Sequence, residues 1–224
     1  GIVAVSLVDI SVIRPTVRTS HVVESYVGPR AGAAATGAAG SIDVGGALSL
    51  HAGQVGSGNT ASLDAFSVSV GLVSFDSVRP DVVVGGRTLA HLGGKFVIDA
   101  GAVNVTASAP DNDASTDVFS LDVGLVNVGG GTTAVRVEHE TASYIADAAD
   151  ITLTGGPLAF LAESTGHAVA ESFSINIGLV GVRDMDAAAT VAGATRAYVG
   201  TNAVLQANNV SLRARSIGNT ADAA

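Results

Sequence analysis

One eight-residue pattern occurs three times in this chain and constrains its fold more than any other feature. The copies are Phe66–Val73, Phe119–Val126 and Phe173–Val180, and their phenylalanines lie 53 and then 54 residues apart. In each copy, apolar residues at the first, third and fifth positions alternate with Ser, Asp or Asn, and Gly-Leu-Val follows. A period of two is typical of a strand with one buried face, and recurrence at a fixed interval indicates a repeat protein.

The segments between these strands repeat as well. Each copy continues with an apolar strand, a turn rich in Gly, Asn or Asp, and a closing strand such as Val103–Ala107. Residues 7–15 match residues 72–80 without a gap, so the N-terminal segment is a further, incomplete copy. We therefore expect a single domain, with a partial copy at 1–65 and full copies at 66–118, 119–172 and 173–224.

The partial copy differs from the others by an insertion of Ala, Gly and Pro between Pro29 and Gly40. Such a composition between strands predicts a loop on one face of the repeat. The chain starts partway through one copy and stops at the end of another, and neither end resembles a capping repeat. A repeat array needs caps, so we expect either a window of a longer array or copies that stack end to end.

Alternating strands, tight turns and the lack of hairpin dipeptides favour an all-β, parallel β-solenoid (β-helix), which we expect to be right-handed. Strands from successive copies should then stack about 4.8 Å apart. Phe66, Phe119 and Phe173 would form one ladder, and Gly71, Gly124 and Gly178 another. We favour about two coils of 27 residues per repeat over one wide, flattened coil. Two coils would give about eight rungs and a height of ~40 Å.

Composition limits the kind of core and the classes of partner that the chain can have. Apolar residues make up 47% of the chain but aromatic residues only 4%, which predicts a thin β core of Ala, Val, Leu and Ile. A net charge of −9 with one lysine, Lys95, argues against nucleic-acid partners and anionic membranes. Without cysteine there are no disulfides. No apolar run approaches the ~20 residues of a spanning helix, and aromatic girdles are missing, so we predict no membrane insertion.

A family resemblance rests on the last copy. Ala197–Val204 reads Ala-Tyr-Val-Gly-Thr-Asn-Ala-Val, and Val210–Ala214 reads Val-Ser-Leu-Arg-Ala. This pattern resembles the repeats of filamentous-haemagglutinin-like and leukotoxin-type filamentous adhesins, which are giant secreted bacterial exoproteins. The insertion at 29–40, His91 and Ala146 depart from the pattern. The resemblance covers essentially the whole chain and implies a β-solenoid fibre on or outside the cell, acting in attachment or as a stalk.

Two groups of oxygen ligands are candidate cation sites. An acidic residue stands two places before each phenylalanine, at Asp64, Asp117 and Glu171. In two-coil repeats these carboxylates would lie near 10 Å apart, too far to share a calcium ion whose ligands lie within ~2.6 Å. A single coil would bring them to about 5 Å. We interpret them as solvated residues, and Asp111-Asn112-Asp113, after Pro110, as a polar turn rather than a calcium loop.

Candidate catalytic groups are few. His21 and His139 share a repeat position with two glycines and are expected to face solvent, whereas His91 takes a slot filled by tyrosine in the other copies. Gly129–Gly131 is expected at a turn, with no helix to bind phosphate. No nucleophile motif is present. We therefore predict no catalytic residue, no metal site and no cofactor. The remaining histidines are His51 and His167.

These observations predict a non-catalytic structural or adhesive segment of a giant extracellular bacterial fibre at the cell surface. Its partners would be neighbouring repeats, identical subunits end to end, or a ligand on a cell surface or matrix. One alternative is a self-assembling filament subunit. A second is a carbohydrate-processing β-helix enzyme, for which Asp111 and Asp113 are the residues to test. The regularity of the copies argues against a catalytic cleft.

Overall fold

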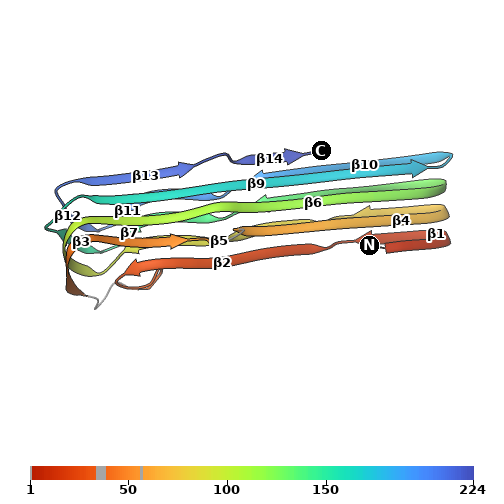
Figure 1. Cartoon of the computed structure of the whole chain (residues 1–224). Coiled ribbons are helices and arrows are strands. Elements are labelled where there is room, and N and C mark those ends of the chain that lie inside the picture. The colour runs from red at the N-terminus through yellow and green to blue at the C-terminus, as the bar shows by residue number, and fades with distance from the viewer. Residues whose placement is uncertain (1, 34–38, 56–57) are drawn as a thin grey trace.

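The computed structural model describes residues 2–33, 39–55 and 58–224, which form strands joined by turns, with no helix in these ranges. All the strand pairs are parallel and belong to one sheet system, as Figure 1 shows. The strands are β1 (Ile2–Ile13), β2 (Thr16–Val27), β3 (Ala39–Gly53), β4 (Asn59–Val78), β5 (Asp81–Leu92), β6 (Lys95–Val137), β7 (Glu140–Ile145), β8 (Asp150–Leu153), β9 (Leu158–Ile177), β10 (Val180–Val191), β11 (Ala194–Val199), β12 (Val204–Gln206), β13 (Val210–Ser216) and β14 (Thr220–Ala223).

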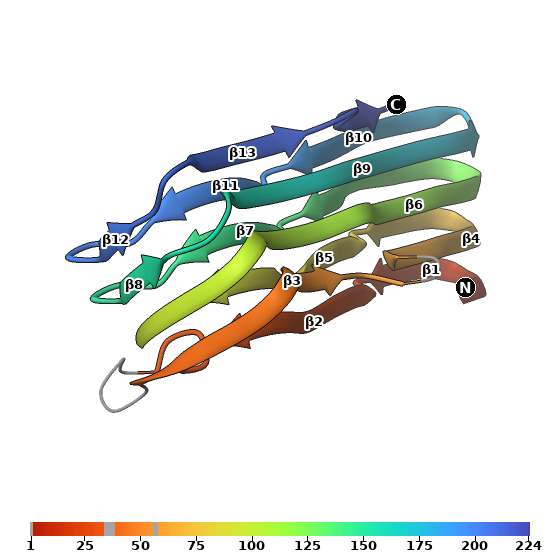
Figure 2. The same ribbon diagram turned by 60° about the vertical axis from the view of Figure 1, so that its left-hand side comes forward.

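Each coil of the chain is a long, flattened loop with two facing sides. The chain runs along one side, for example through β9, reverses at a Gly-Leu-Val sequence, and returns along the other side through β10 and β11. These reversals lie together at one end of the molecule, on the right in Figures 1 and 2. We call this the glycine end, after Gly71, Gly124 and Gly178. The parallel, all-β architecture predicted from the sequence is confirmed.

The strand register gives one coil per repeat. Phe66 lies opposite Phe119 in β4 and β6, and Phe119 lies opposite Phe173 in β6 and β9. Hydrogen-bonded neighbours are therefore 53 and 54 residues apart, and no strand pair of the described chain joins residues about 27 apart. The prediction of two coils per repeat is wrong, because each side of the loop alone takes up about half of the repeat. Four rungs at ~4.8 Å stand about 20 Å tall, half the predicted height.

The partial N-terminal copy is placed as its sequence match indicates. Asp9 lies opposite Ser74, and Tyr26 lies opposite His91. After the inserted segment the register resumes with Ala39 opposite Lys95, so Gly40 already belongs to β3. Residues 34–38 of the predicted loop lie outside the described residues.

Ring stacking confirms the predicted Phe ladder and the predicted place of His91 in a tyrosine slot. The centroids of Phe66 and Phe119 lie 5.5 Å apart, and those of Phe119 and Phe173 lie 6.0 Å apart. His91 stacks between Tyr26 and Tyr144 at centroid distances of 5.5 and 4.8 Å. The histidine therefore fills a tyrosine slot, as its repeat position predicts.

The apolar core lies between the two sides of the coil, away from the glycine end. Its fully buried side chains include Phe160, Leu92, Ile98 and Ile145. Towards the middle of the coil, alanines of β4, β6 and β9 face valines of β5 and β6. Small side chains on one side let the two sheets approach closely, which gives the thin β core that the composition predicts.

The glycine ladder exists because successive backbones come too close for a side chain. A Cβ atom added at Gly124 would lie in hard contact with the carbonyl oxygen of Gly71, whereas one added at Gly45 would meet no atom within 4 Å. We expect Gly124→Ala to lower the free energy of unfolding by about 1–3 kcal/mol through overpacking. The control Gly45→Ala should change it by less than about 0.5 kcal/mol. Urea denaturation of both variants measures the difference, and equal values would contradict the ladder.

Candidate functional site

The glycine end is inverted relative to an ordinary β core. Its inward side chains are polar, and Ser67, Ser69 and Ser120 are completely buried. Its outward side chains are apolar, and Phe66 and Phe173 are 44% and 61% exposed. The prediction that the apolar residues of the Phe strands form the buried face is therefore wrong.

The inversion follows from an unbroken strand. In β4, Ala61 and Ala65 point into the core, and alternate residues keep the same direction along a continuous strand. Ser67 and Ser69 consequently point inward, and Phe66 points outward. The same relation holds in β6, where Val118 precedes the buried Ser120 and Asp122.

The outward residues of segments 3–12, 66–75, 119–128 and 173–182 form one surface, which we call the apolar tip. These segments contain only two charged residues, Asp9 and Asp122, and both are buried on the inner side. The tip holds most of the exposed large hydrophobic side chains of the described chain. They are Val3, Leu7, Val8, Ile10, Val12, Phe66, Leu72, Phe75, Leu125, Val126, Val128, Phe173, Ile175, Ile177, Leu179, Val180 and Val182.

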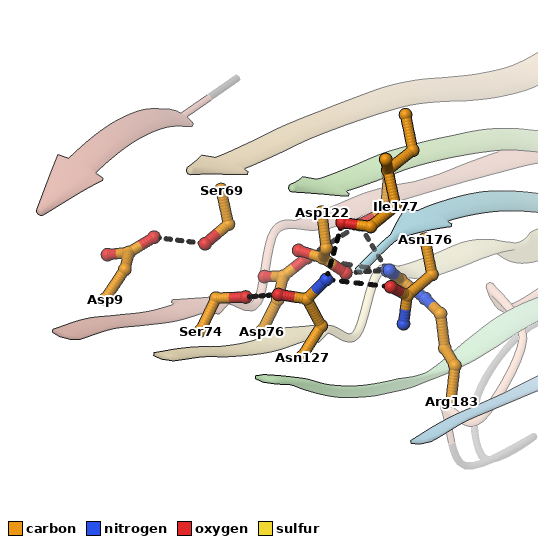
Figure 3. A network of polar contacts seen from close by, with 10 residues as sticks. Asp9, Ser69, Ser74, Asp76, Asp122, Asn127, Asn176, Ile177 and Arg183 are labelled. Carbon is orange, nitrogen blue, oxygen red and sulfur yellow. Dashed lines mark hydrogen bonds and ion pairs between the residues drawn. The ribbon is translucent and has the colours of Figure 1, made fainter. Parts of the chain in front are cut away.

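Beneath the tip, the inward polar residues form a hydrogen-bonded network that crosses between rungs and sides (Figure 3). Ser69 Oγ donates to Asp9 Oδ2, and Ser74 Oγ donates to Asn127 Oδ1 at 2.7 Å. Asn127 Nδ2 then donates to Asn176 Oδ1 at 2.8 Å and to the carbonyl oxygen of Ile177 at 3.2 Å. The network thus links the four rungs from inside.

Arg183 is the cation of this network. Its guanidinium donates to Asp122 Oδ2 and Ser120 Oγ, and it lies 3.6 Å from Asp76 Oδ2. The side chains of Arg183, Asp76 and Asp122 are 9%, 0% and 2% exposed. Burial lowers the pKa of Arg183, and the negative charge of Asp76 opposes this shift. One arginine therefore neutralises part of the charge of two buried carboxylates.

A glycine lies beside this arginine. Gly129 lies opposite Arg183 in the register of β6 and β10, and a Cβ atom there would lie 3.4 Å from both Arg183 Cζ and Asp122 Oδ2. The sequence prediction of a turn at Gly129–Gly131 is wrong, because this segment lies within β6, and the opposite segment Arg183–Asp186 lies within β10.

A groove of about 650 Å³ borders the tip along the Phe ladder, on the side of the coil that runs towards the glycine end. Asp64, Asp117 and Glu171 line it and lie opposite one another in register. Adjacent rungs are ~4.8 Å apart, so the distance argument against a shared cation no longer holds. The three carboxylates are exposed, and the described residues contain no group of three or more His, Asp or Glu side chains arranged to hold a metal ion.

Other sequence candidates fall elsewhere. Asp111-Asn112-Asp113 lies within β6 rather than in a turn, and the register shifts between Ala109 and Asn112. Asn112 is buried and donates to the carbonyl oxygens of Ala109 and Thr165 at 3.1 and 2.9 Å. It therefore points away from the exposed Asp111, and the segment is not a convergent calcium loop.

The expectation that His139 faces solvent is wrong. It is 3% exposed and its Nε2 atom lies 2.9 Å from Thr88 Oγ1, while burial lowers its pKa. The glycines at its repeat position mark a close backbone approach, because a Cβ atom at Gly193 would lie 2.6 Å from the carbonyl oxygen of His139. His21, at the same position, is exposed.

A buried carboxylate holds the described start of the inserted loop. Glu24, whose side chain is 5% exposed, accepts hydrogen bonds from Ala31 N at 2.6 Å and from Arg30 Nε at 2.7 Å. It also lies 3.0 Å from His91 Nε2. Burial alone would raise the pKa of Glu24, but these hydrogen bonds together lower it.

This pKa shift predicts how the loop responds to acid. Glu24 stabilises its contacts with Arg30 and Ala31 fully above the pKa of 4.5 that it has in the unfolded chain, and this stabilisation is lost as pH falls through its lower pKa in the folded chain. We expect hydrogen-exchange protection of the Ala31 amide, corrected for intrinsic rate, to persist at pH 5 and to fall only at more acidic pH. Glu24→Gln should reduce this protection at pH 5 and above, and the difference from the unmodified chain should shrink at more acidic pH. Unchanged protection in that variant would contradict the assignment.

Comparisons of the chain with protein-family profiles, curated proteins and solved structures found no match. In the described ranges, no helix has the length and apolar character of a membrane span.

Proposed function

We propose that this chain is a non-catalytic adhesive and structural segment of a giant extracellular bacterial fibre, built as a right-handed parallel β-solenoid. The observation that carries the proposal is the apolar tip, where even the two middle rungs leave Leu72 51% and Leu125 48% exposed. Exposed apolar patches beyond a few hundred Å² mark interaction sites in soluble proteins.

The family resemblance supports the same proposal. Repeats of the filamentous-haemagglutinin-like and leukotoxin-type kind belong to secreted proteins that attach cells to surfaces. An extracellular location and contact with a cell-surface or matrix ligand are parts of this proposal. The regular ladder of Phe66, Phe119 and Phe173 fits a scaffold whose copies each contribute the same contact group.

Bead attachment tests the adhesive role. Beads coated with the chain should attach to cultured cells, and beads carrying the double variant Leu125→Asp/Leu179→Asp should lose most of this attachment. The matched control is Val97→Asp/Val204→Asp, which places the same charges at sites outside the tip that are 48% and 50% exposed. Equal attachment of the two variants would contradict a role for the tip, and no attachment of the unmodified chain would contradict the proposed function.

A second candidate, an end-to-end filament subunit, is favoured by the two ends of the stack. Within the described chain, β1, β2 and β3 pair on one edge only, as do β10 to β14 at the other end. Unpaired strand edges are templates for adding another chain. Electron microscopy of the purified chain tests this candidate: filaments that lengthen with concentration support it, and discrete monomers exclude it.

A further inference from the structure

We infer that the apolar tip enters the hydrocarbon region of a lipid layer, with the strands along the layer normal and the rungs side by side. The inference rests on the proposed adhesive function and names the chemistry of the surface that is bound. It departs from the sequence-based prediction of no membrane insertion, which considered spanning helices and aromatic girdles rather than the direction of the alternating side chains.

The shape of the tip favours a fluid phase over a protein partner. Apolar side chains cover both outer sides of the flattened coil, for example Ile175 and Val182, and also the turn between them, at Leu179. A second copy packing sheet to sheet would cover one side and leave the other side and the turn in water. A protein partner would need a cleft that sheathes the whole wedge. Lipid chains surround a wedge without a matching shape.

The depth of the tip fits one lipid leaflet. From Phe66 to Leu72 an extended strand spans about 20 Å, and half of a bilayer hydrocarbon core is about 15 Å. Charged side chains begin at a similar level on both sides. Asp64, Asp117 and Glu171 border the tip on one side, and Arg14, Arg79 and Asp184 are exposed at its border on the other. This border would lie among the head groups.

The polar interior fits the same environment. Inside hydrocarbon, polar groups must find partners within the protein. The bonds from Ser120 to Asp76 at 2.7 Å and from Arg183 to Asp122 supply part of these partners. Asp76 Oδ1, Asp122 Oδ1 and Arg183 Nε have no hydrogen-bond partner, and the outward residues shield them from the surroundings. Because the chain carries a net charge of −9 with one lysine, attraction to anionic lipids is not the driving force. Zwitterionic lipid should therefore be sufficient.

The ends of the stack add a condition. In hydrocarbon, the outer backbone edges of β1 and β10 would be costly unless paired. A neighbouring rung from another copy would pair them, so lipid binding should be cooperative in protein concentration. Binding and end-to-end stacking then favour each other.

Flotation of the full chain with phosphatidylcholine vesicles tests the inference. We expect the chain and the control Val97→Asp/Val204→Asp to float with the vesicles. For the tip variant Leu125→Asp/Leu179→Asp, the partition coefficient into the vesicles should fall by about tenfold or more, because aspartate is strongly unfavourable at membrane depth. Circular dichroism should show the same strand signal for both variants, since all four sites are exposed.

A depth measurement provides an independent check. The chain has no tryptophan, so Leu125→Trp reports on the tip and Val97→Trp on the surface outside it. Brominated phosphatidylcholine should quench the first tryptophan and leave the second unchanged. Absence of flotation, or equal quenching at the two sites, would overturn the inference.

The outcomes also separate this inference from the proposed function. If beads attach to cells through the tip but the chain does not float with phosphatidylcholine vesicles, lipid entry is overturned and the adhesive function is retained. If the chain floats with the vesicles but the beads do not attach to cells, the adhesive function is overturned and lipid entry is retained. An unmodified chain that does not float but elutes as an oligomer, with the tip variant eluting as a monomer, would assign the tip to a second copy and overturn lipid entry.

Discussion

Replacing Arg183 with methionine is expected to lower the free energy of unfolding by about 3–5 kcal/mol, because breaking a buried ion pair leaves an uncompensated charge. Asp76 and Asp122 would both remain buried, and Asp122 would lose the guanidinium that now donates to it. Methionine keeps most of the side-chain volume, so the loss reports on charge rather than on a cavity. Urea denaturation at pH 7 measures it.

Arg215→Met is the matched control for this prediction. Arg215 pairs with Glu163 at 3.0 Å, but its side chain is 51% exposed, so its removal should cost no more than about 1 kcal/mol. Adding Asp122→Asn to Arg183→Met should recover part of the stability, because the unpaired charge is then removed. An Arg183→Met variant as stable as the control would contradict the buried network.

Phe160→Ala and Phe173→Ala should differ strongly although both remove a phenyl ring from β9. Phe160 is 1% exposed and packs in the main core, so we expect a loss of about 3–5 kcal/mol. Phe173 lies in the apolar tip and is 61% exposed, so Phe173→Ala should lower the free energy of unfolding in water by about 1 kcal/mol or less. Thermal and urea unfolding of the two variants side by side give the comparison. The opposite order would restore the arrangement expected from the sequence, with the apolar face of the Phe strand inside.

The repeat itself could be predicted because each rung uses the same residue type at the same place. Matching Tyr26, His91, Tyr144 and Tyr198 along the sequence gave the stacked column that the structure contains. In a parallel stack, identical positions lie directly over each other, so sequence alignment between copies is equivalent to strand register. The size of the coil could not be obtained in this way, because one long loop and two short coils give the same sequence interval.

The direction of the side chains was the part of the site that sequence reasoning missed. Alternation separates two faces of a strand but does not say which is inside, and apolar residues were assigned to the core by default. A signal was present: β4 runs without a break from Ala61 and Ala65, whose small side chains suit the space between close sheets, into Ser67 and Ser69. The serines lie an even number of residues after these alanines on the same strand, so alternation from the alanines would have placed the serines inside.

Arg183 was missed for a related reason. Its neighbours in the sequence, Asp184 and Asp186, gave the segment the composition of a polar turn. The residue opposite Arg183 in register is Gly129, which comes from the preceding copy, 54 residues earlier, and which was also interpreted as a turn residue. The pairing of a large charged residue with a glycine one rung away is visible only once the register is known.

The wide coil determines how such a chain would extend under a pulling force. A rung of 53 residues, the interval from Phe66 to Phe119, contributes ~4.8 Å to the height of the stack. If it peels away, the released segment can stretch to about 180 Å at ~3.4 Å per residue. Each detached layer therefore lengthens the molecule by more than thirty times its own thickness. A tether made of these layers would extend in long steps. The remaining layers would keep their contacts while the released segment stretches.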